Sequence, residues 1–104
     1  MTEQTLFILA SLLDGPKHGY AIAQEARELS GERMRLTAGT LYGALERLTD
    51  EGLVEPDREE VVNGRRRRYF RLTGAGAAAI EAETQRLRAT AEAVEARLGR
   101  PRTA

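Results

Sequence analysis

The dipeptide Asn63-Gly64 is the strongest structural signal in this 104-residue chain. Both central residues of a type I′ turn need positive φ, so Asn-Gly between two extended runs predicts a β-hairpin. The return strand is Arg65–Leu72, and its alternating side chains place Phe70 on the face that reaches the core. The hairpin tip carries Arg65, Arg66, Arg67 and Arg68. Because like charges this close repel one another, the tip predicts a polyanionic partner; the alternative is a solvated turn.

The stretch before the hairpin, Thr37–Leu53, has the start, the stop and the two faces of an amphipathic helix. Thr37 can cap the first turn, and Gly52 stands where a left-handed C-terminal cap is needed. The apolar side carries Leu41, Leu45 and Leu48, and the exposed side carries Gly39, Gly43, Glu46, Arg47 and Asp50, flanked by Thr40 and Tyr42. A glycine in a helix costs about 1 kcal/mol relative to alanine, so a close partner such as a nucleic-acid groove is predicted there. The alternative is an ordinary surface helix.

Two more helices are predicted before this one. Thr2–Leu13 is predicted to be a helix. Its second half is apolar nearly all round, so it is expected to pack against other elements on more than one side. Asp14-Gly15-Pro16 is a turn, and His18–Leu29 is the second helix, closed by Ser30-Gly31. Its inner face holds Ile22, Ala23, Ala26 and Leu29. Met34–Leu36 is interpreted as a brief strand.

The last helix is predicted over Gly74–Leu98, with Thr73 as its cap. Its apolar heptad positions are Ala77, Ile80, Thr84, Leu87, Ala91, Val94 and Leu98. Many of these side chains are small or polar, so the helix is expected to pack against a second subunit and not to form a free-standing coiled coil. The predicted organisation is a DNA-binding domain over 1–73, a dimerisation helix over 74–98 and a frayed tail over 99–104. The fold class is mainly α with a two-stranded β wing, a winged helix-turn-helix.

Composition excludes several other classes of protein. The net charge is zero, which by itself does not favour a DNA partner. The basic residues are grouped near the hairpin tip, however, and this distribution does favour one. With no cysteine and one histidine, His18, no metal site or cofactor is predicted. No nucleophile, phosphate loop or catalytic pair is visible, so an enzyme is not expected. The chain has no spanning segment or signal peptide, which predicts a cytoplasmic protein without a membrane role.

Three motifs resemble the PadR family of bacterial transcriptional regulators. They are LLDGPKHGY, TAGTLYGALERLTDEGLV and NGRRRRYFRLTGAG, in the family's order and spacing, within a resemblance that covers about Leu6–Leu98. The resemblance implies a homodimer that binds operator DNA, usually as a repressor, and is released by a small hydrophobic or phenolic effector. Members often have proline where Gly43 stands and a basic residue where Glu46 stands. Glu46 therefore implies reduced affinity or a contact with a cytosine amino group.

The site residues follow from these patterns and from the resemblance. The predicted DNA-binding residues are Tyr20, Thr37, Gly39, Thr40, Tyr42, Gly43, Arg47, Arg65, Arg66, Arg67 and Arg68. The predicted dimer interface and effector cavity are lined by Leu6, Ala10, Leu87, Ala91 and Val94. The operator is expected to be an inverted repeat of double-stranded DNA. The alternative function is a winged-helix adaptor that uses the same surface to bind another protein.

Overall fold

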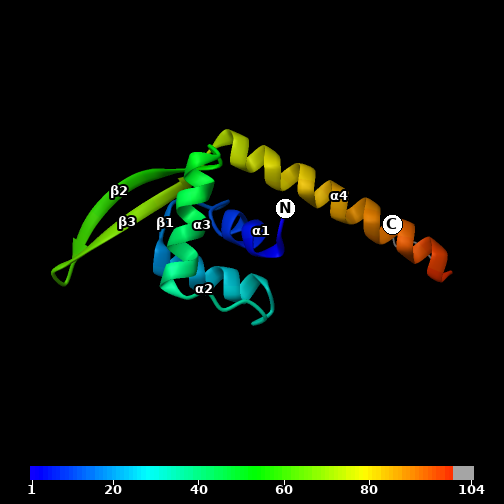
Figure 1. Cartoon of the computed structure of the whole chain (residues 1–104), viewed down its shortest axis with the longest axis horizontal. Coiled ribbons are helices and arrows are strands. Elements are labelled where there is room, and N and C mark those ends of the chain that lie inside the picture. Colours follow the sequence, from blue (N-terminus) through cyan, green and yellow to red (C-terminus); the bar gives the residue numbers. More distant parts are fainter. Residues whose placement is uncertain (100–104) are drawn as a thin grey trace.

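The computed structural model describes residues 1–99, which form four helices and three strands. In chain order the elements are α1 (Glu3–Ala10), β1 (Lys17–His18), α2 (Gly19–Leu29), α3 (Ala38–Asp50), β2 (Val54–Val62), β3 (Arg65–Leu72) and α4 (Gly74–Leu98). Figure 1 shows the β2–β3 hairpin and α4 extending from opposite sides of the body made by α1, α2 and α3. This is a winged helix-turn-helix with a long terminal helix, as the sequence predicts.

The sheet has the strand order β1-β3-β2, and all its pairings are antiparallel. Asn63 has φ 52° and Gly64 has φ 76°, so the predicted turn with two positive φ angles is confirmed. The predicted return strand also has the observed bounds. The sequence did not predict the third strand, in which Lys17 pairs with Phe70 at the base of the hairpin. This strand joins the start of α2 to the wing.

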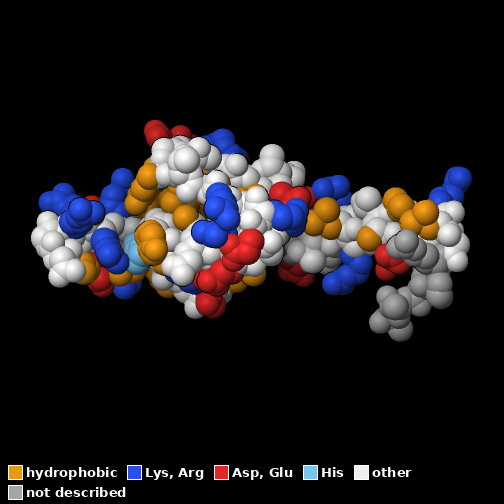
Figure 2. All heavy atoms as spheres, turned by 90° about the horizontal axis from the view of Figure 1, so that it is seen from below, with side chains coloured by type: hydrophobic (Ala, Val, Ile, Leu, Met, Phe, Trp, Pro, Cys, Tyr) orange, Lys and Arg blue, Asp and Glu red, His pale blue; other side chains and the backbone are white. Residues whose placement is uncertain are grey.

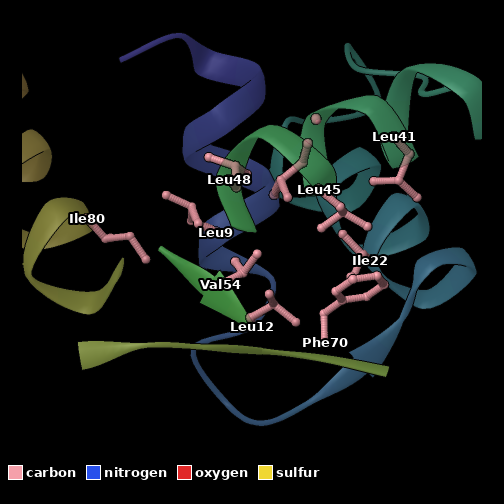
Figure 3. Packing of buried hydrophobic residues seen from close by; sticks show 11 residues of the cluster. Leu9, Leu12, Ile22, Leu41, Leu45, Leu48, Val54, Phe70 and Ile80 are labelled. Atoms are coloured by element: carbon pink, nitrogen blue, oxygen red, sulfur yellow. The ribbon is translucent and has the colours of Figure 1, made fainter. Parts of the chain in front are cut away.

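The core lies where the helices meet the base of the wing. Figure 3 shows its apolar side chains converging from α1, α2, α3, the two long strands and the start of α4. Its buried members are Ile8, Leu9, Leu12, Ile22, Leu41, Ala44, Leu45, Leu48, Val54, Phe70 and Ile80. The apolar face predicted for Thr37–Leu53 and the inward direction of Phe70 are confirmed. The core holds α3 by one side and leaves its other side exposed.

The ends of α3 and the start of α4 are formed by the residues that the sequence singles out. The Thr40 backbone N–H donates to Thr37 Oγ1 at 3.2 Å, and the Gly76 N–H donates to Thr73 Oγ1 at 3.0 Å. At the other end of α3, Gly52 has φ 77° and the Leu53 N–H donates to the Leu48 carbonyl. This is a Schellman motif, which left-handed glycine makes possible.

The first helix is shorter than predicted: it ends at Ala10, and residues 11–14 form a turn. Ser11 Oγ donates to the Ile8 carbonyl, and Lys17 Nζ donates to the Ser11 carbonyl. These side chains therefore bond the backbone carbonyls that a longer helix would have paired with backbone N–H groups. The turn buries Leu12 in the core and leaves Leu13 57% exposed.

The predicted strand at Met34–Leu36 is wrong, because these residues form no regular element. The Met34 N–H donates to Ser30 Oγ at the end of α2, and β1 occupies the place beside β3. The predicted inward position of Leu29 is also wrong, since its side chain is 48% exposed. Leu29 is the last residue of α2, where the chain turns away from the core.

Beyond its first turns, α4 leaves the body of the molecule (Figure 1). None of residues 84–98 is buried in the single chain. Gly99, with φ 75°, ends the helix in a left-handed conformation, and residues 100–104 of the predicted tail lie outside the described residues. Among the helices of residues 1–99, none combines the length and the apolar character needed to cross a membrane.

Gly76 lets the first turn of α4 approach the base of the wing. A Cβ built on Gly76 would lie 2.2 Å from the Leu53 carbonyl oxygen and 2.6 Å from Leu72 Cδ1. We expect Gly76→Ala to lower the free energy of unfolding by about 1–3 kcal/mol, because a backbone oxygen must move. Urea unfolding measures this change. Gly74→Ala is the matched control, since a Cβ there meets nothing within 4 Å; equal losses of stability in the two variants would contradict this packing role of Gly76.

Candidate nucleic-acid interface

The exposed side of α3 is open from its first turn onward. A Cβ built on Gly39 or Gly43 would meet nothing within 4 Å, so neither glycine is required by packing inside the chain. Thr37 and Thr40 lie beside them, with their hydroxyls 3.0 Å apart in a hydrogen bond. The N-terminal half of α3 therefore presents small groups and two hydroxyls to solvent, which is a shape that admits the edge of another molecule.

Tyr42 is half exposed and lies across the start of α2. A Cβ on Gly19 would come within 2.5 Å of the Tyr42 hydroxyl oxygen, so the absence of a side chain at Gly19 makes room for the ring. The Tyr42 and Phe70 ring centroids are 6.5 Å apart. Gly19 is not among the residues predicted from the sequence; its position at the first residue of a helix, where glycine has no advantage, was the available signal. Tyr42 thus connects α2, α3 and the wing.

Arg47 has two partners within the chain. Its Nη2 donates to Thr5 Oγ1 at 3.0 Å, and its Nη1 donates to the Glu51 carboxylate at 3.2 Å. The guanidinium therefore attaches the last turn of α3 to α1. The predicted contact between Arg47 and DNA stays a prediction; the two bonds use two of the five guanidinium N–H donors, and the side chain is half exposed.

The arginines of β3 divide into paired and unpaired groups. Arg71 donates to Glu55 at 2.8 Å and to Asp57 at 3.1 Å, and Arg66 lies 3.7 Å from the Glu59 carboxylate. Within residues 1–99, Arg65, Arg67 and Arg68 form no ion pair. Figure 2 shows basic side chains gathered at the wing end of one face, whereas both signs of charge occur along α4. The positive charge available to a partner comes mainly from the three unpaired arginines.

A hollow of about 250 Å³ lies between the start of α2, α3 and the wing. We name it the interface hollow. It is lined by His18, Gly19, Tyr20, Tyr42, Arg65, Arg66, Arg67 and Arg68. Six of the predicted DNA-binding residues therefore share one surface. Tyr20, which is 74% exposed, stands at its edge.

His18 also lines this hollow, although the sequence predicts for it only a place at the start of the second helix. It caps α2, because the Ala21 N–H donates to its Nδ1 at 3.3 Å. On the other side of the ring, Nε2 lies 3.2 Å from Arg67 Nη1, and the Tyr69 ring meets the imidazole edge-on at 5.4 Å. Burial lowers the pKa of His18, the positive charge of Arg67 lowers it further, and Glu60 opposes both effects.

The residues predicted for the dimer interface lie on α1 and α4. Leu6 is partly buried and packs against the core, and Ala10 is half-buried at the end of α1. Leu87 is 43% exposed and Val94 is 53% exposed, and Ala91 between them is also exposed. The single chain leaves the apolar stripe of α4 uncovered.

Residues 8–82 match the family described as Transcriptional regulator PadR-like. Over 89 residues the chain is 39% identical to the transcriptional regulator Rv3488 of Mycobacterium tuberculosis, and the match covers 86% of this chain and 79% of that protein. It is 43% identical over 81 residues to an uncharacterized 37.1 kDa protein in transposon TN4556 of Streptomyces fradiae. That match covers 78% of this chain and spans 22% of the length of the transposon protein.

Solved structures share the fold. A PadR family transcription regulator from Clostridium difficile superposes with a TM-score of 0.78 at 27% identity, covering 93% of this chain and 99% of that one. Bacillus subtilis PadR in complex with operator DNA superposes with a TM-score of 0.67 at 25% identity. The second match covers 77% of this chain and 45% of the Bacillus subtilis chain.

Proposed function

This chain belongs to the Transcriptional regulator PadR-like family, and we propose that it is a homodimeric repressor that binds operator DNA and is released by a small molecule. Members of this family are transcriptional regulators and not enzymes. The observation that carries DNA binding is the position of the unpaired arginines beside the open side of α3, around the interface hollow. Such a surface is complementary to DNA, which offers base edges in a groove beside a phosphate backbone.

In the proposed complex, the N-terminal half of α3 enters the major groove. Gly39 and Gly43 permit close approach, and the Thr40 hydroxyl reaches base edges or phosphates. The wing lies along the DNA backbone and the minor groove. There the positive charge of arginine adds affinity that does not depend on the base sequence. Glu46, one turn further along α3, is exposed and can accept from a cytosine amino group.

A second copy of the chain is the proposed partner of α4. Most of the stability of a helix in a protein comes from packing of its apolar face, and the stripe on α4 that includes Leu87 and Val94 is exposed in the single chain. In a two-fold dimer, α1 and α4 of each chain pack against the same elements of the other. Two copies of α3 are then presented to DNA, which is why an inverted repeat is the expected operator.

The proposed effector site lies between the two subunits. Its lining is the predicted set of Leu6, Ala10, Leu87, Ala91 and Val94. A cavity lined in this way would take a small hydrophobic or phenolic molecule, because it offers apolar contacts and no charged group. The sequence contains no tryptophan, so binding depends on aliphatic packing and not on stacking against an indole. Binding there would change the spacing of the two α3 helices.

The proposal predicts specific, salt-dependent binding of an inverted repeat upstream of the chain's own gene. We expect two chains per repeat and an affinity at least about 10³ times that for a scrambled duplex of the same composition. Half-sites should be separated by about one or two helical turns. Fluorescence anisotropy at several salt concentrations measures affinity and its salt slope, and sedimentation gives the stoichiometry.

A winged-helix adaptor would give a different result in the same experiment. Its apolar interface with a protein responds little to ionic strength, whereas a complex that neutralises phosphates weakens steeply as salt rises. Equal binding of the repeat and the scrambled duplex would contradict the proposed regulator, even if both bound well.

A further inference from the structure

We propose that His18 and Arg67 together bind one phosphate of the DNA backbone, with the imidazole Nε2–H and the guanidinium as its two donors. The inference rests on the proposed DNA binding and adds a site that lies outside α3. Both side chains line the interface hollow. They come from residues far apart in the sequence, at the start of α2 and in β3, and β1 brings these elements together.

The contact between the two side chains leaves a hydrogen-bonding conflict in the free protein. The Ala21 N–H donates to Nδ1 of His18, so the neutral ring carries its proton on Nε2. Arg67 Nη1, which can only donate, faces that Nε2 at 3.2 Å. A neutral imidazole has one acceptor nitrogen and satisfies one of these contacts, and the protonated ring satisfies neither. An anionic oxygen that accepts from both Nε2–H and the guanidinium removes the conflict.

The charges that face the ring favour an anion at this place. Arg65, Arg66 and Arg68 line the same hollow, and within residues 1–99 Arg67 has no carboxylate partner. The acid that faces His18 is Glu60 of β2, whose carboxylate already accepts from the Tyr69 hydroxyl and from Arg58. The two aromatic neighbours of the ring, Tyr20 and Tyr69, bring no carboxylate to it. The local charge is therefore positive.

Protonation of His18 is linked to this site. In the free chain its pKa lies below the ordinary value, so the ring is neutral at pH 7 and keeps the Nδ1 bond that caps α2. A phosphate beside Nε2 favours the charged form and raises the pKa in the complex. Affinity for DNA therefore rises as pH falls through the pKa of the complex, and it levels off below the pKa of the free chain.

A scan of the operator with single methylphosphonate linkages tests the site without altering the protein. Each substitution removes the charge of one phosphate. We expect one linkage in each half-site at which the substitution weakens binding of the unaltered chain roughly tenfold. The same substitution should weaken binding of His18→Asn clearly less, by about threefold, because Arg67 is then the one donor that remains to that phosphate. Asparagine can still cap α2, but its side chain ends before the position of Nε2.

A double-mutant cycle asks whether the two donors share one phosphate. If they do, the decrease in affinity of His18→Asn with Arg67→Gln is smaller than the product of the two single decreases by at least about twofold. The cycle of His18→Asn with Arg65→Gln is the control, and there the decreases should multiply. Thermal unfolding of each variant checks that α2 remains capped. A cycle that is multiplicative for both arginines would overturn the shared site.

The failure of this site and the failure of the proposed regulator give different results. If the operator is bound but no methylphosphonate linkage affects the unaltered chain more than His18→Asn, the phosphate site is overturned. The proposed regulator then still stands. Titration with inorganic phosphate, followed at the ring resonances of the chain's one histidine, tests the site in the absence of DNA. Shifts that disappear in Arg67→Gln would support the site even if no operator were bound, and shifts that persist in that variant would count against it.

Discussion

Replacing Gly43 with leucine is expected to remove most of the preference for operator DNA. The position faces solvent in the middle of α3, and a Cβ there meets nothing within 4 Å, so leucine adds bulk only toward the partner. If α3 enters the major groove, that bulk separates the helix from the base edges. We expect affinity for the operator to fall about 10³-fold, toward that for scrambled DNA. Competition between the two duplexes measures the change.

Two controls distinguish blocked docking from damage to the fold. Leucine favours a helix by nearly 1 kcal/mol relative to glycine, so Gly43→Leu should unfold at an equal or higher urea concentration. Gly74→Leu introduces the same side chain at an open position at the start of α4, outside the interface hollow, and should bind as the parent does. A Gly43→Leu chain that binds the operator as tightly as the parent would show that this side of α3 stays out of the groove. The adaptor hypothesis would then be preferred.

Changing Arg65, Arg67 and Arg68 together to alanine is expected to weaken binding to all DNA sequences alike. Each phosphate that the protein no longer neutralises lowers the slope of log affinity against log salt by about 0.9, so the triple variant should lower it by about 2.7 for each chain bound. Arg66 is expected to contribute less, since Glu59 already lies within 3.7 Å of it. Titrations of operator and scrambled duplex at several salt concentrations give the slopes.

Arg71→Ala is the matched control for the triple variant. It removes a charge of the same kind from the same strand, but Arg71 is already held by Glu55 and Asp57. Its salt slope should equal that of the parent. If the triple variant also kept the parent slope, the arginines at the tip would form only a solvated turn, and the polyanion interpretation of the wing would be wrong.

The predictions that the structure confirms are those that depend on a few consecutive residues. A threonine hydroxyl can reach an N–H three residues away, which is why Thr37 and Thr73 cap the helices predicted from them. The Asn63-Gly64 turn likewise needs only its own two φ angles. The resemblance to the PadR family, read from three such local motifs, is confirmed by the match over residues 8–82.

The incorrect predictions have a different cause, because each depended on contacts outside the segment from which it was made. Helix α1 stops at Ala10 since Lys17 reaches back to the Ser11 carbonyl. Met34–Leu36 forms no strand, and β1, at Lys17–His18, pairs with β3. A short extended run does not determine which edge it pairs with, so propensity alone could not separate these two segments.

The order of the four helices and the hairpin, the caps of α3 and α4, and the clustering of arginines at the hairpin tip could be predicted from the residues in sequence. Which glycines are approached closely, and which arginines are neutralised, became visible only once the chain was folded. Gly19 and Gly76 face neighbours that the sequence did not predict, whereas Gly39 and Gly43 face open space, in agreement with their place on the exposed side of the predicted helix. The difference is one of range. Caps and turns are made by neighbours in the chain, but the surroundings of a side chain depend on how elements far apart in sequence pack.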